Sequence, residues 1–182
     1  MPRLYLVRHG RSTATFSEAG DVGLDPVGVA QAEAVAAGLA PLGPLAVVVS
    51  PLRRARETAA PLERTWGRAG TVEPAVGEIP SLLADPTARA AWLRRLLQAR
   101  WGDAEPELQT WRRGVVDTLL ALRESTVIFS HYVAINVAVG ACTGDDRVAP
   151  FSPAHCSVTV VDTDGGSLRL LERGGEATTP VL

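Results

Sequence analysis

The chain has 182 residues, of which 46% are hydrophobic and 21% are charged, and its formal net charge is −2. This length suits a single domain, residues 1–182, with one sizeable core. The slight negative charge argues against a nucleic-acid binder, which would carry a basic excess, and no apolar run is long enough to span a bilayer. All 18 residues of the Lys and Arg class are arginines, so a bound anion would be held by guanidinium, imidazole or backbone donors.

Two cysteines, Cys142 and Cys156, lack the CxxC spacing of metal and redox sites and are too few for a disulfide framework. Their apolar surroundings predict reduced, buried thiols. The short apolar run at the N-terminus is interrupted by arginines, which is not typical of a signal peptide. We therefore expect a soluble, cytoplasmic protein.

Strands and helices are expected to alternate from the start of the chain. Residues 3–7 predict a buried strand. A helix should follow from Asp25, a plausible N-cap, to Leu39, because its apolar residues recur at helical spacing. The β-branched residues 44–50 predict a second buried strand.

The second predicted helix opens with a serine cap and a proline, Ser50 and Pro51, and contains Pro61 as a candidate break. A weaker strand is expected over residues 71–79. Pro74 predicts that this segment lies at a sheet edge or is irregular, since proline has no N–H to donate to a neighbouring strand.

The second half of the chain predicts three helices, a strand and a hairpin. Helices are expected over residues 85–101 and 105–124, a buried strand over 125–131 and a further helix over 132–144. Residues 155–174 predict a hairpin that turns at an Asp-Gly-Gly sequence. This alternation predicts an α/β fold: a three-layer αβα sandwich with a mostly parallel sheet.

Polar residues end each of the three most strand-like segments. Arg8 and His9 follow the first strand, Ser50 and nearby arginines the second, and His131 the third. In a parallel sheet these ends meet at one edge, where ligands bind. Such a cationic cluster would repel itself without an anion in its midst, and phosphate is the obvious candidate.

The motifs resemble those of the histidine phosphatase superfamily, also called phosphoglycerate mutase-like, and in particular its phosphatase branch. The resemblance rests on "LVRHGRS" (6–12), "SPLRRARETA" (50–59), the acidic "GEI" (77–79) and "SHYVAINVAVG" (130–140). Their order and spacing fit from residue 4 to about residue 157. The resemblance implies the phosphoglycerate mutase-like fold.

The resemblance also implies a role for each matched residue. His9 would be the nucleophile, attacking phosphorus to form a phosphohistidine, with a hydrogen bond on its other ring nitrogen to fix the tautomer. Arg8 and Arg54 would hold the phosphoryl oxygens, and His131 would donate to them. Gly10 matches the turn beside the ligand, where the chain must bend closely.

The leaving oxygen also needs a proton donor, which the family places between the second and third motifs. Glu78 is preferred because it precedes Ile79 as in the family pattern; Glu73 is the competitor and Asp85 a weaker one. A general acid needs a raised pKa, which burial favours and neighbouring arginines oppose.

Three positions depart from the family pattern around the expected phosphate site. Arg11 replaces an acid or amide, although Ser12 is retained, and Thr15 stands where the family has Asn. Thr15 would offer one hydroxyl donor in place of the amide. Tyr132 replaces a glycine and would narrow the pocket or stack on a substrate. These changes weigh against a mutase and leave the substrate open.

Residues outside the matched motifs are given simpler interpretations. His155 is taken as a structural or surface residue, and a metal site is disfavoured because arginines crowd the histidines. Residues 80–112 are expected to form a helical cap or insertion. Trp92, Trp101 and Trp111 are assigned to helix packing there, with substrate selection as the alternative.

The sequence therefore predicts a metal- and cofactor-independent phosphatase that acts on a small phosphorylated substrate as a monomer or homodimer. Two alternatives stay open. One is a phosphoprotein or phosphohistidine phosphatase with an open site, in which the acid is dispensable. The other is a degenerate member of the family that binds a phosphorylated ligand without turnover, as the departures at Arg11, Thr15 and Tyr132 suggest.

Overall fold

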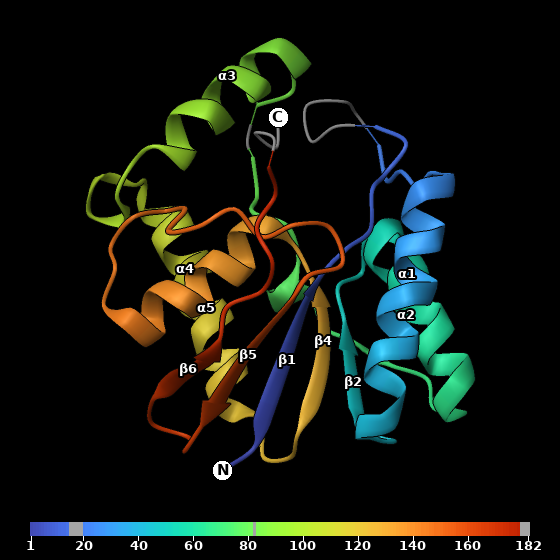
Figure 1. Cartoon of the computed structure of the whole chain (residues 1–182). Coiled ribbons are helices and arrows are strands. Elements are labelled where there is room, and N and C mark those ends of the chain that lie inside the picture. Colours follow the sequence, from blue (N-terminus) through green and yellow to red (C-terminus); the bar gives the residue numbers. More distant parts are fainter. Residues whose placement is uncertain (15–19, 82, 179–182) are drawn as a thin grey trace.

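The computed structural model describes residues 1–14, 20–81 and 83–178, and these form one six-stranded sheet. The strand order is β3-β2-β4-β1-β5-β6. Figure 1 shows the sheet with helices on both sides. In chain order the strands are β1 (Arg3–Arg8), β2 (Ala46–Val49), β3 (Thr71–Val72), β4 (Thr126–Ser130), β5 (Val158–Thr163) and β6 (Leu168–Glu172).

The first four strands of the chain run parallel to one another. β4 lies between β1 and β2, with Ser130 opposite Arg8 and Phe129 opposite Val49. β5 pairs antiparallel with β1, and β6 antiparallel with β5. The α/β class and the largely parallel sheet are thus confirmed. The predicted hairpin is also present, and Asp164 closes its turn by accepting from the backbone N–H of Gly166.

Five α-helices surround the sheet in the described part of the chain. α1 and α2 pack together on one side, α4 and α5 on the other, and α3 lies beyond the edge where β1, β2 and β4 end (Figure 1). Their bounds are α1 Pro26–Leu39, α2 Arg53–Trp66, α3 Pro86–Leu97, α4 Pro106–Ala121 and α5 Tyr132–Thr143. Each side of the sheet has its own apolar cluster, centred on Phe129 and Ala59 at α2 and on Ile128 and Ile135 at α5.

Local sequence explains where α1 begins and where α5 ends. Asp25 caps α1, since its carboxylate accepts from the backbone N–H of Gly28 at 2.7 Å. α5 ends at Gly144, whose φ of 69° lies in the left-handed region that glycine adopts without steric cost. Both termini follow the prediction.

The structure corrects two expectations for α2. The helix begins at Arg53 with Leu52 as its N-cap residue, and the Ser50 hydroxyl bonds both to the N–H of Leu52 at 3.3 Å and to His131 at 2.7 Å. Pro61 lies inside the helix and does not break it. Burial of the helix face around Pro61, including the completely buried Leu62, offsets the lost backbone hydrogen bond.

The weak strand predicted over residues 71–79 is mostly not a strand. β3 covers only Thr71–Val72 at the sheet edge, and Pro74 opens a 3-10 turn over Pro74–Val76. Glu73 caps that turn by accepting from the N–H of Ala75 at 2.9 Å. The turn redirects the chain so that Glu78 reaches the carboxyl edge of the sheet.

The tryptophans after Glu78 belong to helix packing. Trp101 is 1% exposed, its ring centre lies 6.3 Å from that of Trp111, and both join the apolar cluster of α4 and α5, against which Trp92 also packs. Within the described residues, no helix is both long enough and apolar enough to cross a membrane.

Candidate active site

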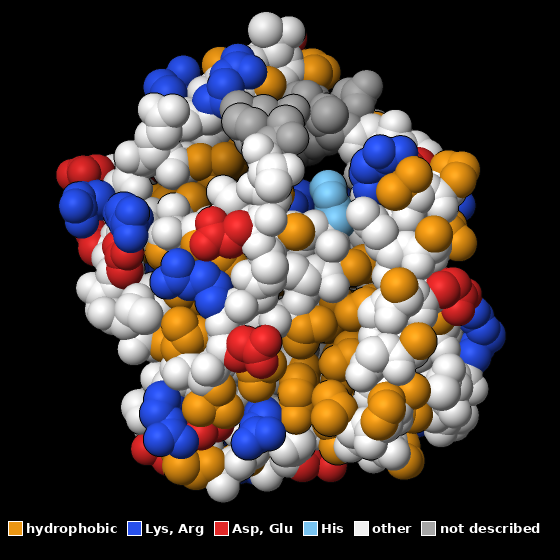
Figure 2. All heavy atoms as spheres, viewed as in Figure 1, with side chains coloured by type: hydrophobic (Ala, Val, Ile, Leu, Met, Phe, Trp, Pro, Cys, Tyr) orange, Lys and Arg blue, Asp and Glu red, His pale blue; other side chains and the backbone are white. Residues whose placement is uncertain are grey.

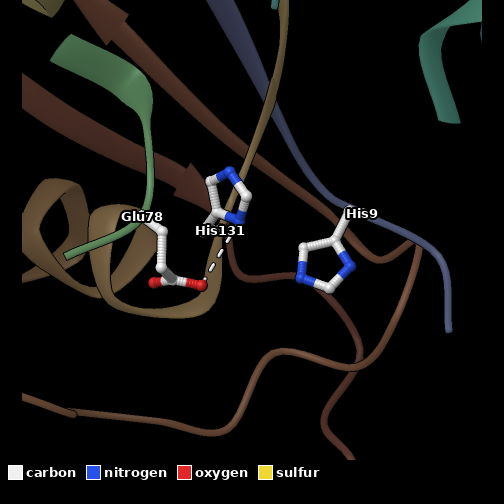
Figure 3. A group of neighbouring side chains, drawn as sticks. All are labelled: His9, Glu78 and His131. Atoms are coloured by element: carbon white, nitrogen blue, oxygen red, sulfur yellow. Dashed lines mark ion pairs between the residues drawn. The ribbon is translucent and has the colours of Figure 1, made fainter. Parts of the chain in front are cut away.

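Backbone hydrogen bonds join the ends of the three central strands. The N–H of His9 donates to the carbonyl of Ser130 at 3.0 Å, and the N–H of Ser50 donates to that of Phe129 at 3.0 Å. Because the strands are parallel neighbours, the polar residues that follow them are brought together. Figure 3 shows His9, Glu78 and His131 approaching one another from three separate segments.

A cavity of about 970 Å³ opens over this edge of the sheet. Figure 2 shows the hollow near the top of the molecule, with a histidine and arginines at its mouth. The polar side chains at its floor are those of Arg8, His9, Arg54 and Glu78. The cavity is much larger than a phosphate ion, so it has room for an organic group attached to a phosphate.

His9 is held with one ring nitrogen occupied and the other facing the site. Its Nδ1 lies 2.8 Å from the carbonyl oxygen of Gly10, which can only accept, so Nδ1 carries a proton. Nε2 accepts from Nε of Arg54 at 3.3 Å. Burial, together with the nearby His131, Arg54 and Arg8, lowers the pKa of His9 well below its usual value. The ring is therefore neutral at pH 7, with Nε2 unprotonated and accepting from Arg54.

Gly10 and Thr58 fix the loop that carries His9. The N–H of Gly10 donates to Oγ1 of Thr58 at 3.0 Å, and this hydroxyl donates in turn to the carbonyl of Arg54 at 2.6 Å. A Cβ on Gly10 would lie 2.7 Å from the carbonyl oxygen of Gly28, so α1 leaves room only for glycine. Gly10 thus shapes the loop, and Thr58 joins the loop to α2.

Arg8 is a buried cation at the cavity floor. It is 3% exposed, its Nη1 donates to the carbonyl of Pro153 at 2.8 Å, and its guanidinium lies 5.3 Å from the ring centre of Tyr132. Its Nε is buried without a hydrogen-bond partner among the described residues. Burial lowers the pKa of Arg8 to about 10, which leaves it charged at neutral pH. This orphaned donor suits an anionic oxygen.

Arg54 and Glu78 face each other across the cavity floor. Arg54 Nη2 and Glu78 Oε2 are 3.2 Å apart, with side chains 11% and 15% exposed. Burial alone would raise the pKa of Glu78, but the neighbouring His131 and Arg54 outweigh it and lower the pKa to about 2. Of the two opposing effects named from the sequence, the neighbouring charges therefore outweigh burial, because the arginine and histidine stabilise the carboxylate.

His131 is completely buried behind these groups. Its Nδ1 lies 3.3 Å from Glu78 Oε2, at ion-pair distance but outside hydrogen-bond geometry, and its Nε2 lies 2.7 Å from Oγ of Ser50. The His131 ring centre is 5.1 Å from that of His9. Burial lowers the pKa of His131, although Glu78 opposes this. His131 is not among the described residues that line the cavity, whereas Glu78, which lies beside it, is.

The two competing acids lie elsewhere. Glu73 caps a 3-10 turn, and Asp85 caps α3 by accepting from the N–H of Ala88 at 2.7 Å. Neither belongs to the described lining of the cavity. Among the three candidates, only Glu78 reaches the cavity.

Two of the residues that depart from the family pattern, Arg11 and Tyr132, lie at the cavity beside the retained Ser12. Arg11 is 52% exposed and its Nε bonds to Asp25 at 2.5 Å, while the Ser12 hydroxyl donates to the carbonyl of Ala14 at 2.7 Å. The Tyr132 hydroxyl is bonded to Ser152 at 3.1 Å. Arg11, Ser12 and Tyr132 all line the cavity. Thr15 lies outside the described residues.

His155 also lines the cavity, which the sequence analysis missed. Its Nε2 lies 3.1 Å from Nη2 of Arg8, and its ring centre is 5.7 Å from that of His9. The predicted hairpin placed His155 near the start of β5, but the sequence did not show that β5 pairs antiparallel with β1. That pairing brings the start of β5 to the edge where β1 ends.

α3 forms the wall of the cavity opposite α1 and α2. Ala90, Leu93 and Leu97 line it with apolar groups, and Arg94 adds an exposed cation. α3 lies within the segment 80–112, which was expected to be a cap. The wall thus combines an apolar surface with positive charge.

Three of the clustered groups could in principle ligate a metal. The nearest ligand atoms of His9, Glu78 and His131 lie within 4.8 Å of one another. However, Arg54 already contacts both His9 Nε2 and Glu78 Oε2, and a divalent cation there would lie beside a fixed guanidinium charge. The donor set fits an anion better than a metal ion.

Comparisons with solved structures show proteins that share this fold. Among solved structures, a mycobacterial glucosyl-3-phosphoglycerate phosphatase bound to VO3 is 23% identical, with a TM-score of 0.73, covering 98% of this chain and 100% of its own. A phosphoserine phosphatase from Entamoeba histolytica in complex with 3-phosphoglyceric acid is 19% identical, with a TM-score of 0.76 and 98% of both chains covered. A protein from Thermus thermophilus is 26% identical, with a TM-score of 0.63, and 95% of this chain and 99% of that protein are covered.

No curated protein matches the chain. The model of the histidine phosphatase superfamily (branch 1) matches residues 4–174, which include all the site residues described above and every strand of the sheet except the first residue of β1. The chain therefore belongs to branch 1 of the histidine phosphatase superfamily.

Proposed function

We propose that the protein is a phosphatase that hydrolyses a small phosphomonoester through a phosphohistidine on His9. The observation that carries the proposal is the state of His9, whose Nδ1–H is bonded to Gly10 while the Nε2 electron pair faces Arg54 at the cavity floor. The names of the similar glucosyl-3-phosphoglycerate and phosphoserine phosphatases support the reaction class. The fixed guanidinium charges make a metal unnecessary for neutralising the phosphoryl group.

In the first step, Nε2 of His9 attacks phosphorus and the bond from phosphorus to the ester oxygen breaks. The leaving oxygen takes a proton from Glu78 and departs as an alcohol. Arg8 and Arg54 stabilise the negative charge on the other phosphoryl oxygens. The orphaned Nε–H of Arg8 is well suited to this contact.

Glu78 must gain a proton before it can act as an acid. With a pKa of about 2 it is ionised in the empty site. A bound phosphate dianion would repel the carboxylate and draw Arg54 and His131 towards itself, and both changes raise the pKa of Glu78. Where Nε2 of His131 accepts from the Ser50 hydroxyl, Nδ1 carries the ring proton, and this proton can be donated to a phosphoryl oxygen once Glu78 is neutral.

In the second step, water attacks the phosphohistidine. The ionised Glu78 now takes a proton from that water, the phosphorus–nitrogen bond breaks, and inorganic phosphate leaves with His9 restored. The sum of the two steps is hydrolysis of a phosphomonoester to an alcohol and phosphate.

The α3 wall favours a small substrate over a phosphorylated protein side chain. Apolar groups of Leu93 and Leu97 face the cavity, which encloses about 970 Å³. A volume of this order is typical of small-molecule sites. We therefore propose that residues 80–112, which contain α3, act as a cap that contacts the alcohol part of the substrate.

Steady-state hydrolysis of p-nitrophenyl phosphate and of a panel of phosphorylated metabolites tests the proposal. The wild-type protein should hydrolyse the generic substrate, and His9→Ala should reduce kcat by about 10³-fold or more, since the nucleophile is lost. Arg56→Gln serves as a control, because Arg56 is an exposed residue of α2 outside the described cavity lining. No hydrolysis of any panel member, or full activity in His9→Ala, would refute the proposal.

A further inference from the structure

His155 is a partly buried histidine in the cavity that the proposed reaction does not use. It comes from the segment before β5, whereas Arg8 ends β1 and His9 follows it. Its Nε2 lies 3.1 Å from Nη2 of Arg8. Since a guanidinium only donates, Nε2 of His155 is the acceptor and the ring proton resides on Nδ1.

The guanidinium of Arg8 is fixed from two sides by this segment. Nη1 donates to the carbonyl of Pro153 at 2.8 Å, and Nη2 donates to His155. The ring of Tyr132 lies against the guanidinium, with its centre 5.3 Å from the guanidinium carbon. These contacts leave Nε as the guanidinium nitrogen without a hydrogen-bond partner in the described structure. An arginine held in this way loses little further entropy when it binds an anion.

The segment itself is strained and bonded to the backbone of Arg8. Cys156 has a φ of 55°, in the left-handed region that residues other than glycine seldom adopt. Its N–H donates to the carbonyl of Arg8 at 2.9 Å, and the N–H of Arg8 donates to the carbonyl of Ser157 at 3.3 Å. Strained backbone persists where the surroundings over-determine it, most often at functional sites. Here the result is that His155 lies next to Arg8.

From these contacts we infer that His155 is a positioning residue that orients Arg8 to receive the phosphoryl group. The inference rests on the proposed function of the cavity, but it concerns anion binding and does not require turnover. The charge state of His155 agrees with it. Burial and the guanidiniums of Arg8 and Arg11 lower the pKa of His155 to about 4, against the opposing carboxylate of Asp25. Although His9 also lies nearby, it too is neutral, so His155 can accept from Arg8 at pH 7.

Affinity for inorganic phosphate, measured by titration calorimetry at pH 7, tests the inference. His155→Leu fills the same space without an acceptor and should weaken phosphate binding by about tenfold, since a charge-assisted hydrogen bond is lost. His155→Gln places an amide oxygen near the position of Nε2 and should restore most of the affinity. His155→Asn has a shorter side chain, cannot reach Arg8, and should resemble His155→Leu.

A double-mutant cycle shows whether His155 acts through Arg8. In an Arg8→Gln background, His155→Leu should have little further effect on phosphate affinity, whereas in an Arg54→Gln background the loss should persist. Arg54 is the matched control because it is a second cation of the floor with no described contact to His155.

Three results would overturn the inference: unchanged affinity in His155→Leu, failure of His155→Gln to exceed His155→Asn, or equal losses in the two backgrounds. Thermal unfolding shows whether each variant folds. If His155→Leu does not fold, the comparison of phosphate affinity between His155→Gln and His155→Asn tests the inference. A wild-type protein that binds phosphate but hydrolyses no ester would refute the proposed function and leave this test intact.

Discussion

The floor of the cavity and its α3 wall differ in how their charged groups are held. On the floor, Arg54 and Glu78 are bonded to each other with side chains 11% and 15% exposed. On the wall, Arg94 is exposed and makes no hydrogen bond or ion pair within the described part of the chain. Groups fixed in advance suit a reaction whose charges appear at set positions. A loosely held cation suits contacts that vary with the substrate.

The wall and the floor also come from different kinds of element. Arg8 ends β1, His9 follows it, and Arg54 lies in the first turn of α2, while Glu78 follows the 3-10 turn after β3. The wall is a helix beyond the sheet edge. We therefore expect substitutions on the floor to impair the reaction with every substrate, and those on the wall to change substrate preference.

Replacement of Arg54 should have the largest effect of the variants that keep the nucleophile. Arg54→Gln removes a cation that contacts both His9 Nε2 and Glu78. We expect kcat/KM to fall by about 10²–10³-fold for all phosphomonoesters, as when a transition-state donor is lost. Arg53→Gln is the control, since Arg53 is exposed and pairs with Glu57. A loss confined to one substrate would contradict the distinction between floor and wall.

Replacement of Glu78 should have an effect that depends on the leaving group. Glu78→Gln keeps the shape but cannot transfer a proton, so an alkyl phosphate should react about 10²-fold more slowly. A nitrophenyl phosphate should lose much less, because its leaving group needs no acid. Parallel assays of both substrates with Glu73→Gln as control check this. Equal losses of rate on the two substrates would show that Glu78 is not the proton donor.

Glu78 should also make stability depend on pH. Its pKa is lowered in the folded protein to about 2 from an ordinary 4.5, so its stabilising contribution is present above about pH 4.5 and is lost as the pH falls towards 2. Urea unfolding at pH 7 and pH 3 should show a smaller acid-induced loss for Glu78→Gln than for the wild type. Identical losses would indicate that the carboxylate is not stabilised by folding.

Thr58 supports the floor without lining the described cavity. Thr58→Val removes the bonds to the Gly10 N–H and the Arg54 carbonyl, and should lower the free energy of unfolding by about 1–3 kcal/mol because a buried N–H is left unpaired. Thr58→Ser keeps the hydroxyl and should lose less. Urea titrations of both variants measure the difference, and equal stabilities would argue against the hydroxyl's role.

Replacement of Arg94 should have the smallest effect, and only on some substrates. Arg94→Ala should raise KM by no more than about fivefold for phosphomonoesters that carry a second negative charge, in line with the modest strength of exposed ion pairs. It should leave p-nitrophenyl phosphate unaffected. Arg95→Ala, the next exposed arginine of α3, should change neither KM. A general loss of kcat in Arg94→Ala would place this wall residue with the floor.

The sequence predicted the elements whose signals are local. The buried strand ending at Ser130, the Asp25 cap and the Asp-Gly-Gly turn are all found in the structure. Polar residues after three strands also predicted the meeting of Arg8, His9 and His131, because strand ends in a parallel sheet share an edge. The roles assigned to these residues stay predictions.

The parts that could not be predicted depend on contacts between distant segments. Ser50 looked like a helix cap, but its hydroxyl bonds to His131, 81 residues away, and α2 starts later. Glu78 reaches the cavity because a 3-10 turn precedes it, whereas the sequence predicted a strand over residues 71–79. His155 joins the site only because β5 runs antiparallel to β1. Each depends on tertiary packing that local propensity does not report.

Rapid-quench trapping of the phosphoenzyme tests the central claim most directly. The protein would be mixed with a ³²P-labelled phosphomonoester, quenched in alkali within one turnover, and digested to locate the label. We predict an acid-labile phosphate on His9 that appears and decays at rates compatible with kcat, and no label in His9→Ala. Turnover with no trapped species, or label on another residue such as His155, would contradict the account.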